Sequence, residues 1–421
     1  MSKFEDLIKQ LCPNGVDYKR FDEACTLHAR IGWQRLTKAE YRPSGEYMLI
    51  TGTDFTDLHT IDYNSCVYVS EERYIQDKKI QLMDGDVLIT KDGTLGKVAQ
   101  VQNLPMPATL NGGVFVVRSI DGNLEPRFIL HYLLSDHFQK VVEQQKTGST
   151  ISHLTQELFS RLRIPIPPLE VQREIVRVLD SFTLLTAELT AELTDRKKQY
   201  DYYGNQLFEK IKDEVNVYSV GEIIISLKTG LNPRQNFSLN ETGSCYPYIT
   251  GKDIFDNKIN VSERTDLITP VALELINKRA HLEKGLLLFA STGTGTVGRM
   301  AIIEEYNNDW GISETLYGIK VDEAVVLPHY LMFFLYSVAA RKQFEPKISK
   351  GSVPHLKVKE LLDVKIPVPS IEKQREIVKI LIKFDSLCND ISKGIPAEIN
   401  ARQKQYEYYR DKLLSFKEMN C

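Results

Sequence analysis

Two loops rich in glycine and threonine carry the side chains best suited to phosphate chemistry. They read Thr90-Lys-Asp-Gly-Thr-Leu-Gly-Lys97 and Ser291-Thr-Gly-Thr-Gly-Thr-Val-Gly-Arg299, and each ends on a basic residue. Exposed backbone amides, hydroxyl groups and a cation are the groups that bind phosphate oxygens. We therefore predict phosphate contacts from Lys91, Thr94, Lys97, Thr292, Thr294 and Arg299. The same glycines also suit a hairpin turn with positive φ, and this structural alternative stays open.

A second pair of loops combines side chains that can hydrogen-bond to the edges of bases. Arginine, asparagine and glutamine form paired hydrogen bonds with one base in the major groove. The candidates for DNA binding are Arg30, Trp33, Gln34 and Arg35 in the first loop, and Lys228, Asn232, Arg234 and Gln235 in the second. A solvated surface loop is the alternative interpretation of both. His153 and His355 also recur, and a repeated histidine is more often a hydrogen-bonded structural residue.

The motifs of common catalytic sites are missing from the sequence. There is no GxxxxGK[ST] loop, no GxGxxG turn, no HExxH motif and no GxSxG elbow. A segment of the Asn-Pro-Pro-Tyr or Asp-Pro-Pro-Tyr type, which clamps adenine in amino-methyltransferases, is also absent. The six cysteines form no CxxC pair, which argues against a zinc site and a disulfide framework. We therefore predict a binding scaffold with no catalytic residues, no metal and no cofactor of its own.

Composition places the chain among ordinary globular proteins, with one feature that opposes DNA binding. The 421 residues are 42% hydrophobic and 26% charged, and no apolar run approaches the ~18 residues of a membrane span. The N-terminus lacks an apolar signal-peptide core, so we expect a cytoplasmic protein without membrane contact. The net charge is −3, whereas DNA-binding domains are usually basic. A DNA-binding function must therefore rest on particular side chains and not on the overall charge.

The elements that must position these loops are written twice. Residues 164–176 recur as residues 366–378, with Gln-Arg-Glu-Ile-Val intact in both copies. Residues 196–203 recur as residues 402–409, and both segments end in Lys-Gln-Tyr-x-Tyr-Tyr. Weaker matches in the same order include Thr-Gly-x-Asp at the end of a predicted strand. One unit of about 200 residues is therefore used twice, which predicts an internal pseudo-twofold repeat. An old duplication kept only for folding is the alternative.

Each repeat ends in a long predicted helix. The Ile-Pro-x-Pro segments cannot be helical, so the helices should begin near Glu170 and Glu372. Steps of four and three predict a coiled-coil seam in the first helix at Val171, Ile175, Val178, Phe182, Leu185, Leu189, Leu193, Tyr200, Tyr203 and Leu207. The corresponding seam of the second helix contains Ile377, Ile380, Phe384, Leu387, Ile391, Ile399, Tyr406, Tyr409 and Leu413.

We predict that these two helices pair in antiparallel fashion; the alternative is that each packs only on its own domain. Gly394-Ile-Pro396 should break or kink the second helix, because glycine and proline disrupt helical hydrogen bonding. Residues 186–193 of the first helix hold a tandem Thr-Ala-Glu-Leu repeat. Each copy of that repeat corresponds to ~6 Å of helix.

The front part of each repeat predicts a compact α+β domain with a twisted sheet. Short apolar runs predict strands at 47–50, 85–90, 97–101 and 113–118, and again at 246–249, 285–290, 299–303 and 316–321. One helix is predicted after each set, at 126–143 and 328–344. The predicted organisation is an N-terminal helix near the C-terminal helices (1–20), a first domain (21–155), a central helical spacer (156–212), a second domain (213–356) and a C-terminal helical spacer (357–421).

Two divergent domains, each followed by Ile-Pro-x-Pro, Gln-Arg-Glu-Ile-Val and Lys-Gln-Tyr-x-Tyr-Tyr, resemble the DNA-specificity subunits of type I restriction–modification enzymes. The resemblance covers essentially the whole chain. It implies that each front domain is a target-recognition domain, which reads half of a bipartite, asymmetric site in double-stranded DNA. It also implies that the helices set the spacing between half-sites and dock two modification subunits, which bind S-adenosylmethionine and methylate adenine. Two restriction subunits can join such a complex for translocation and cleavage with ATP and Mg²⁺.

Under this resemblance, the repeated side chains of the helical motifs are candidates for docking the modification subunits. They are Gln172, Arg173, Glu174, Tyr200, Tyr203, Gln374, Arg375, Glu376, Tyr406 and Tyr409. Two other functions remain alternatives. One is a coiled-coil adaptor whose front domains bind proteins, in which the basic Gly/Thr loops would have no role. The other is an enzyme that binds a nucleotide through those loops.

Overall fold

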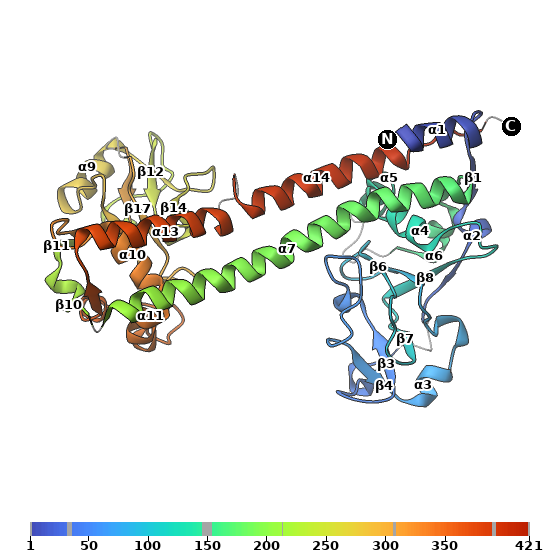
Figure 1. Cartoon of the computed structure of the whole chain (residues 1–421), viewed down its shortest axis with the longest axis horizontal. Coiled ribbons are helices and arrows are strands. Elements are labelled where there is room, and N and C mark those ends of the chain that lie inside the picture. The colour runs from blue at the N-terminus through green and yellow to red at the C-terminus, as the bar shows by residue number, and fades with distance from the viewer. Residues whose placement is uncertain are drawn as a thin grey trace. The chain divides into compact units, whose positions relative to one another are not determined.

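The computed structural model describes residues 2–31, 36–144, 154–212, 214–305, 309–389 and 393–419. The chain forms two compact units, called here unit 1 (Met1–Thr190 with Ile399–Cys421) and unit 2 (Ala191–Glu398). Figure 1 labels many of the elements of both units. No helix in these ranges is long and apolar enough to cross a membrane.

Unit 1 contains a four-stranded antiparallel sheet and a three-stranded mixed sheet. The order of the larger sheet is β2 (Cys25–His28), β8 (Val114–Ser119), β5 (Val87–Thr90) and β6 (Val98–Gln100). The order of the smaller sheet is β4 (Val67–Val69), β3 (Tyr47–Ile50) and β7 (Ala108–Leu110), in which β3 and β7 are parallel. The predicted strand at 47–50 is therefore confirmed to the residue, and the other three lie within two residues of their predicted ends.

Unit 2 repeats this arrangement strand for strand. The larger sheet is β11 (Ile224–Thr229), β19 (Leu316–Val321), β16 (Leu287–Ala290) and β17 (Met300–Ile302). The smaller sheet is β15 (Leu267–Ile268), β12 (Tyr246–Ile249) and β18 (Gly311–Ile312), with β12 and β18 parallel. A further hairpin joins β13 (Ile254–Phe255) and β14 (Lys258–Ile259). The structure confirms the predicted repeat and the predicted α+β fold.

The larger sheets are buried on both faces, which explains why their strands read as continuous apolar runs. In β5, Val87 and Ile89 point into a cluster shared with the helices, whereas Leu88 joins the cluster beneath the smaller sheet. In β16, Leu287 and Phe289 likewise point into the cluster shared with the helices, and Leu288 joins the cluster beneath the smaller sheet. The loops at the strand ends therefore rest on a sheet that is packed from above and below.

Each predicted domain helix is in fact two helices, so the prediction of one helix per domain was wrong. Unit 1 has α4 (Pro126–Leu133) and α5 (Asp136–Gln144), and unit 2 has α10 (Pro328–Tyr336) and α11 (Val338–Phe344). A serine stands at each break. The Oγ atoms of Ser135 and Ser337 each accept a hydrogen bond of 3.3 Å from an amide in the first turn of the following helix. This local side-chain bond competes with a continuous helix.

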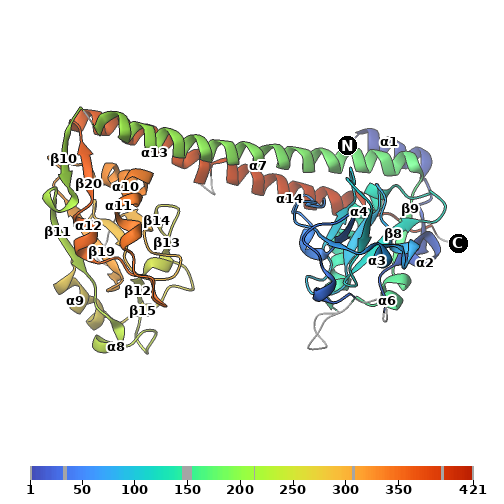
Figure 2. The ribbon, with the colours of Figure 1, turned by 90° about the horizontal axis from the view of Figure 1, so that it is seen from below.

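Short elements tie the front of each unit to its long helices. Strand β1 (Asp17–Arg20) pairs with β9 (Arg163–Ile166), and β10 (Asn216–Ser219) pairs with β20 (Lys365–Val368), as Figure 2 shows for unit 2. The remaining short helices are α1 (Ser2–Leu11), α2 (Phe21–Ala24), α3 (Glu71–Ile75), α6 (Gln156–Arg161), α8 (Pro233–Asn236), α9 (Pro270–Arg279) and α12 (Val358–Leu362). Phe4, Leu7 and Ile8 of α1 pack on the unit 1 core, which also contains Leu413 and Leu414 near the C-terminus.

The long helices are α7 (Leu169–Lys212), α13 (Ile371–Asn389) and α14 (Ile395–Leu413). The predicted starts of the helices and the predicted break at Gly394-Ile-Pro396 are confirmed. In unit 1, α7 and α14 run in opposite directions (Figure 1). Phe182 of α7 stacks on Tyr409 of α14, with ring centroids 5.4 Å apart. In unit 2, α7 packs against α13 through Tyr200 and Phe384, whose ring centroids are 6.4 Å apart. The predicted antiparallel pairing is therefore present within each unit.

The predicted seam is displaced by one residue at several positions. The predicted seam residues Val171, Ile175, Ile377, Tyr406 and Leu413 are buried, whereas Leu185, Tyr203, Ile380 and Leu387 are exposed. Leu179, Phe208, Leu381 and Cys388, each one residue after a predicted seam position, are buried instead. Each helix packs on a domain as well as on a second helix, so it needs the wider apolar stripe of an ordinary 3.6-residue helix and not the narrow heptad seam. Ile391 lies outside the described residues.

Candidate nucleic-acid interface

In each unit, the Gly/Thr loop lies against the Thr-Gly-x-Asp turn that follows the central strand of the smaller sheet. A Cβ added to Gly52 would lie 2.5 Å from Cγ2 of Thr90, so only glycine allows this approach. In unit 2, a Cβ on Gly251 would lie 3.1 Å from Cβ of Thr296. The sequence shows the Thr-Gly-x-Asp repeat, but nothing in it reveals that this turn supports the loop.

The Thr-Gly-x-Asp turns are fixed by the same capping bonds in both units. Asp54 accepts a hydrogen bond from the amide of Thr51 at 2.7 Å, and Asp253 accepts one from the amide of Thr250 at 2.9 Å. Both carboxylates are buried. The turns therefore form rigid supports for the loops above them.

The Gly/Thr loops are tight connections between antiparallel strands, so the hairpin interpretation is confirmed. Gly93 and Gly96 have φ of 71° and 84°, and Gly295 and Gly298 have φ of 73° and 86°. Thr90 donates its hydroxyl hydrogen to the carbonyl of Thr94 inside the first loop. In the first loop, the amides of Gly96 and Lys97 donate to carbonyls of the same loop, so these two amides are not available to a phosphate.

The predicted phosphate-binding residues divide into exposed and internally bonded groups. Thr94, Lys97 and Thr294 are exposed. Lys91 lies over the ring of Phe115, with its nitrogen 5.0 Å from the ring centroid. Two others are used inside unit 2: the hydroxyl of Thr292 bonds to Nδ1 of His355 at 2.7 Å, and Arg299 donates to the carbonyl of Ile254 at 3.2 Å. His355 is therefore hydrogen-bonded within the fold, whereas His153 lies outside the described residues.

Unit 1 has an open cavity of 670 Å³ beside its Gly/Thr loop. Four segments line it: Leu36, Lys38 and Tyr41; residues 51–53; residues 92–94; and residues 111–114. The amide of Asn111 donates to the hydroxyl of Tyr41 at 2.9 Å and holds two of these segments together. Lys38 and Asn111 were not among the predicted residues, because neither belongs to a repeated motif.

Arg30 corrects the prediction of a base-reading residue. Its side chain is only 1% exposed. It donates to the carbonyls of Leu110 and Arg73, at 3.0 and 3.2 Å, and to the side chains of Gln76 and Thr109, at 3.1 and 3.2 Å. Arg30 therefore connects the segment that follows β2 to β7 and to α3. From this position its side chain cannot reach a base edge. Trp33, Gln34 and Arg35 lie outside the described residues.

The corresponding loop of unit 2 presents its predicted residues more openly. Lys228, Arg234 and Gln235 are exposed. Asn232 instead holds the loop: its Oδ1 accepts from the amide of Arg234 at 2.9 Å, and its Nδ2 donates to Glu314 at 2.9 Å. The loop passes so close to β18 that a Cβ on Gly230 would lie 1.6 Å from the carbonyl oxygen of Ile312. The exposed side chains of Arg234 and Gln235 therefore project from a loop that is packed closely against β18.

Comparison with known proteins assigns this fold to a family. The family model for the type I restriction–modification DNA specificity domain matches the chain twice, at residues 13–196 and 212–401. The chain belongs to this family.

Relatives of this specificity family align over most of the chain. The specificity subunit of the type I restriction enzyme EcoR124I/EcoR124II of Escherichia coli is 35% identical over 314 residues, which cover 72% of this chain and 74% of that relative. A putative type I restriction enzyme specificity subunit of Haemophilus influenzae, S.HindORF215P, is 34% identical over 345 residues, with coverages of 78% and 82%. These matches favour a DNA-specificity chain over a coiled-coil adaptor.

Solved structures of the family share the fold. The type I S subunit from M. genitalium superposes with a TM-score of 0.51 at 17% identity, and the match covers 96% of this chain and 97% of that one. A chain from work on complex assembly and conformational transition of the type I restriction–modification system gives a TM-score of 0.58 at 17% identity, with coverages of 96% and 98%.

The glutamines of the Gln-Arg-Glu motif are structural residues of this specificity fold, which corrects their predicted role in docking. Gln172 is fully buried; its Nε2 donates to the carbonyls of Asn123 and Pro167, both at 2.7 Å, and its Oε1 accepts from the amide of Glu125 at 2.9 Å. Gln374 makes the same three contacts with residues 325, 369 and 327, at 2.8, 2.9 and 2.9 Å. Each glutamine therefore fastens a long helix to the start of α4 or α10.

The remaining motif residues differ in exposure. Arg173 is exposed and pairs with Glu125 at 2.8 Å, whereas Arg375 and Glu376 are exposed in unit 2. Glu174 is buried. A hydrogen bond from Arg177, with a further contribution from Lys3, outweighs the effect of burial and lowers the pKa of Glu174 to about 2. Among the tyrosines, Tyr203 is 52% exposed, Tyr200 and Tyr409 are partly buried, and Tyr406 is buried. Glu174 and Tyr406 therefore stabilise the fold and are not available for docking.

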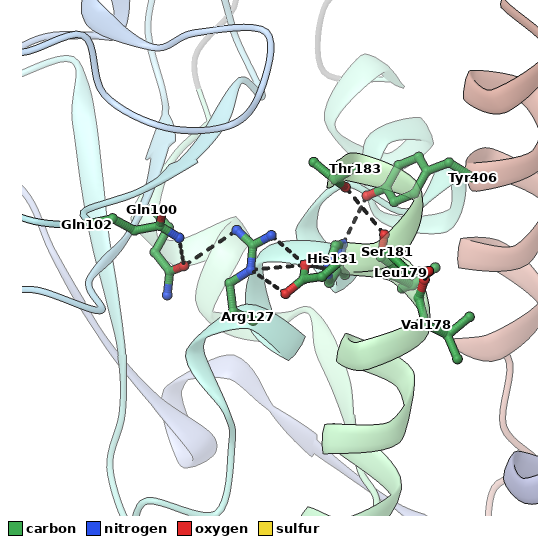
Figure 3. Close-up of polar contacts among 10 residues, drawn as sticks. Gln100, Gln102, Arg127, His131, Val178, Leu179, Ser181, Thr183 and Tyr406 are labelled. Carbon is green, nitrogen blue, oxygen red and sulfur yellow. Dashed lines mark hydrogen bonds and ion pairs between the residues drawn. The ribbon is translucent and has the colours of Figure 1, made fainter. Parts of the chain in front are cut away.

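Tyr406 belongs to a buried polar network where α4 meets α7 and α14 in unit 1 (Figure 3). Nδ1 of His131 lies 3.0 Å from the hydroxyl of Tyr406, and Nε2 lies 2.8 Å from Oδ1 of Asp180. Because a carboxylate only accepts, the Nε2 atom carries the hydrogen and Nδ1 accepts from tyrosine. Nε of Arg127 donates to both oxygens of Asp180 at 3.2 Å. The network joins two segments that lie 275 residues apart in the sequence.

Acid should weaken this network and the packing of α4 in unit 1. Burial lowers the pKa of His131 despite the opposing effect of Asp180. Burial alone would raise the pKa of Asp180, but hydrogen bonds from His131 and Arg127 and the charge of Arg127 lower it overall. Both pKa values lie below the unfolded values of about 6.5 and 3.9, so the unfolded chain binds more protons than the folded chain. The free energy of unfolding therefore decreases as the pH is lowered.

The loss should begin near pH 6.5 and deepen below pH 4, and hydrogen exchange of α4 and the first turns of α7 would measure it. Unit 2 supplies the comparison, because Phe333 and Ile382 occupy the positions that correspond to His131 and Asp180. Equal acid sensitivity of α4 and α10 would contradict this assignment.

Proposed function

We propose that this chain is the DNA-specificity subunit of a type I restriction–modification complex, in which each unit reads one half of a bipartite, asymmetric site in double-stranded DNA. The observation that carries the proposal is one scaffold with two different loop surfaces. Strand order, the capped turns and the three contacts of the buried glutamine recur in both units. Within the Gly/Thr loops the exposed side chains differ: Thr94 and Lys97 are exposed in unit 1, whereas in unit 2 Thr294 is exposed and Arg299 donates to the carbonyl of Ile254.

Catalysis in this proposal belongs to partner chains. Two modification subunits would bind S-adenosylmethionine and methylate adenine, and restriction subunits would use ATP and Mg²⁺. Their basic surfaces would supply the phosphate contacts that a chain of net charge −3 lacks. The modification subunits would dock on the exposed motif residues Arg173, Tyr203, Arg375 and Glu376. Exposed Tyr202 and Tyr408, which occupy matching positions in the two repeats, extend this set of candidates.

Replacement of Arg234 by alanine tests the reading function of unit 2. If its guanidinium makes a bidentate base contact, the loss should be about 1–3 kcal/mol of binding free energy, and specificity should relax at one base pair of one half-site. Methylation-aware sequencing of DNA from cells that express the complex would reveal the change in the site. Arg264→Ala, an exposed arginine in another loop of unit 2, is the matched control. An unchanged site and unchanged affinity would return this loop to the solvated-surface interpretation.

A further inference from the structure

The junction between domain and long helix differs sharply between the two units. In unit 1 it is filled by Arg127, His131 and Asp180 (Figure 3). The corresponding residues of unit 2, each 202 positions later, are His329, Phe333 and Ile382. These residues line an open cavity of 530 Å³. The guanidinium that fills the junction in unit 1 therefore has no counterpart in the lining of the unit 2 cavity.

The cavity has an apolar floor. Met332 and Phe333 of α10 and Ile382 of α13 contribute to the floor, and Trp310 stands beside them. Ile382 is 44% exposed although it faces a cavity on a packed unit. An apolar floor of this kind favours a hydrocarbon chain as its occupant, because covering it removes apolar area from water.

The rim of the same cavity is acidic. Its lining contains the four carboxylates of Asp256, Glu304, Glu305 and Asp385 and the single lysine Lys258. Asp385 accepts hydrogen bonds from the side-chain amides of Asn257 and Asn389, both at 2.9 Å. A carboxylate oxygen of Glu304 lies 3.0 Å from Nε2 of His329. These contacts hold the carboxylates of Asp385 and Glu304 in place. The rim therefore attracts a cation and repels the phosphate backbone of DNA.

We propose that this cavity receives a lysine or arginine side chain of a protein partner. Such a side chain can lay its methylene stem on an apolar surface and present its charged end to carboxylates. Arg127 presents its charged end in this way within unit 1, where it donates to the carboxylate of Asp180. The partner is the modification subunit, and this identification rests on the proposed function. Because unit 1 is already closed, the contact belongs to only one of the two docking positions.

Neutralising the rim tests this inference on the full-length chain with its purified modification subunit, in the absence of DNA. The variant E304Q/E305Q/D385N should bind one modification subunit at least tenfold more weakly at low salt, with a smaller dependence of affinity on salt concentration. Native mass spectrometry at limiting concentration should then show complexes with one modification subunit, where the wild-type chain forms complexes with two. The control E241Q/E263Q/E323Q removes the same charge from exposed positions elsewhere in unit 2 and should bind as the wild-type chain does.

A second variant covers the case in which the first one is unstable. Ile382→Arg places a cation of this chain in the cavity and should block the partner in the same asymmetric way while the carboxylates stay intact. Two modification subunits bound with wild-type affinity in either correctly folded variant would overturn the inference and leave the proposed function standing. If the wild-type chain bound no modification subunit, the proposed function itself would be contradicted, and the inference with it.

Discussion

Replacement of Arg30 by alanine should lower the free energy of unfolding of unit 1 by about 3–5 kcal/mol. The guanidinium is buried and donates to two carbonyls and two side chains in unit 1. Alanine would remove these hydrogen bonds, among them the buried one to the carbonyl of Leu110, and each buried acceptor left unpaired costs about 1–3 kcal/mol. The deleted side chain would also leave a void at the exit of β2, which adds to the loss.

Thermal or denaturant unfolding, followed by a probe in unit 1, would measure this effect. Arg234→Ala is the control, because the arginine is exposed and its loss should leave stability within about 0.5 kcal/mol. The two variants therefore separate two uses of the same side chain in loops that look alike in sequence. A stable Arg30→Ala protein that had lost affinity for DNA would restore Arg30 to the set of base-reading residues.

The elements of this fold that were predictable are those whose signal is local. Buried strands such as Leu316–Val321 are predicted from short apolar runs in the sequence, and the starts of α7 and α13 are predicted from the prolines that precede them. The repeat supplied independent support, since each strand of unit 1 has a counterpart in unit 2. Agreement between two divergent copies is a stronger signal than either copy alone.

The failures concern side chains whose partners are distant in sequence. Gln172 looks like a surface residue at the start of an amphipathic helix, but its contacts are backbone groups 47 to 49 residues away in the loop before α4 and one nearby carbonyl. Arg30 bonds to groups 43 to 80 residues away. A polar residue type reports its capacity for hydrogen bonding and not the location of its partner. Repetition of the glutamine indicated importance, and only the structure assigns that importance to stability.

Adding a third Thr-Ala-Glu-Leu copy to α7 should lengthen the spacer between half-sites by one or two base pairs and leave both half-sites unchanged. Four residues add ~6 Å to a helix, which is nearly two base pairs at ~3.4 Å each. The existing copies, residues 186–193, span the point at which α7 passes from unit 1 to unit 2. The residues of this segment are exposed or only partly buried, and the hydroxyls of Thr186 and Thr190 bond to carbonyls of their own helix. The insertion should therefore lengthen the helix without removing a core contact from either unit.

Mapping methylated adenines in cells that express the lengthened chain would measure the spacer. The double variant T186A/T190A is the matched control, because it changes the sequence of the segment but keeps its length, and its site should equal that of the wild-type chain. The helix is continuous for 44 residues, whereas its companion is divided between α13 and α14, so α7 is the stiffer candidate for setting the distance. An unchanged spacer in the lengthened chain would show that α7 does not set it. A change in either half-site would mean that the insertion had disturbed a recognition domain.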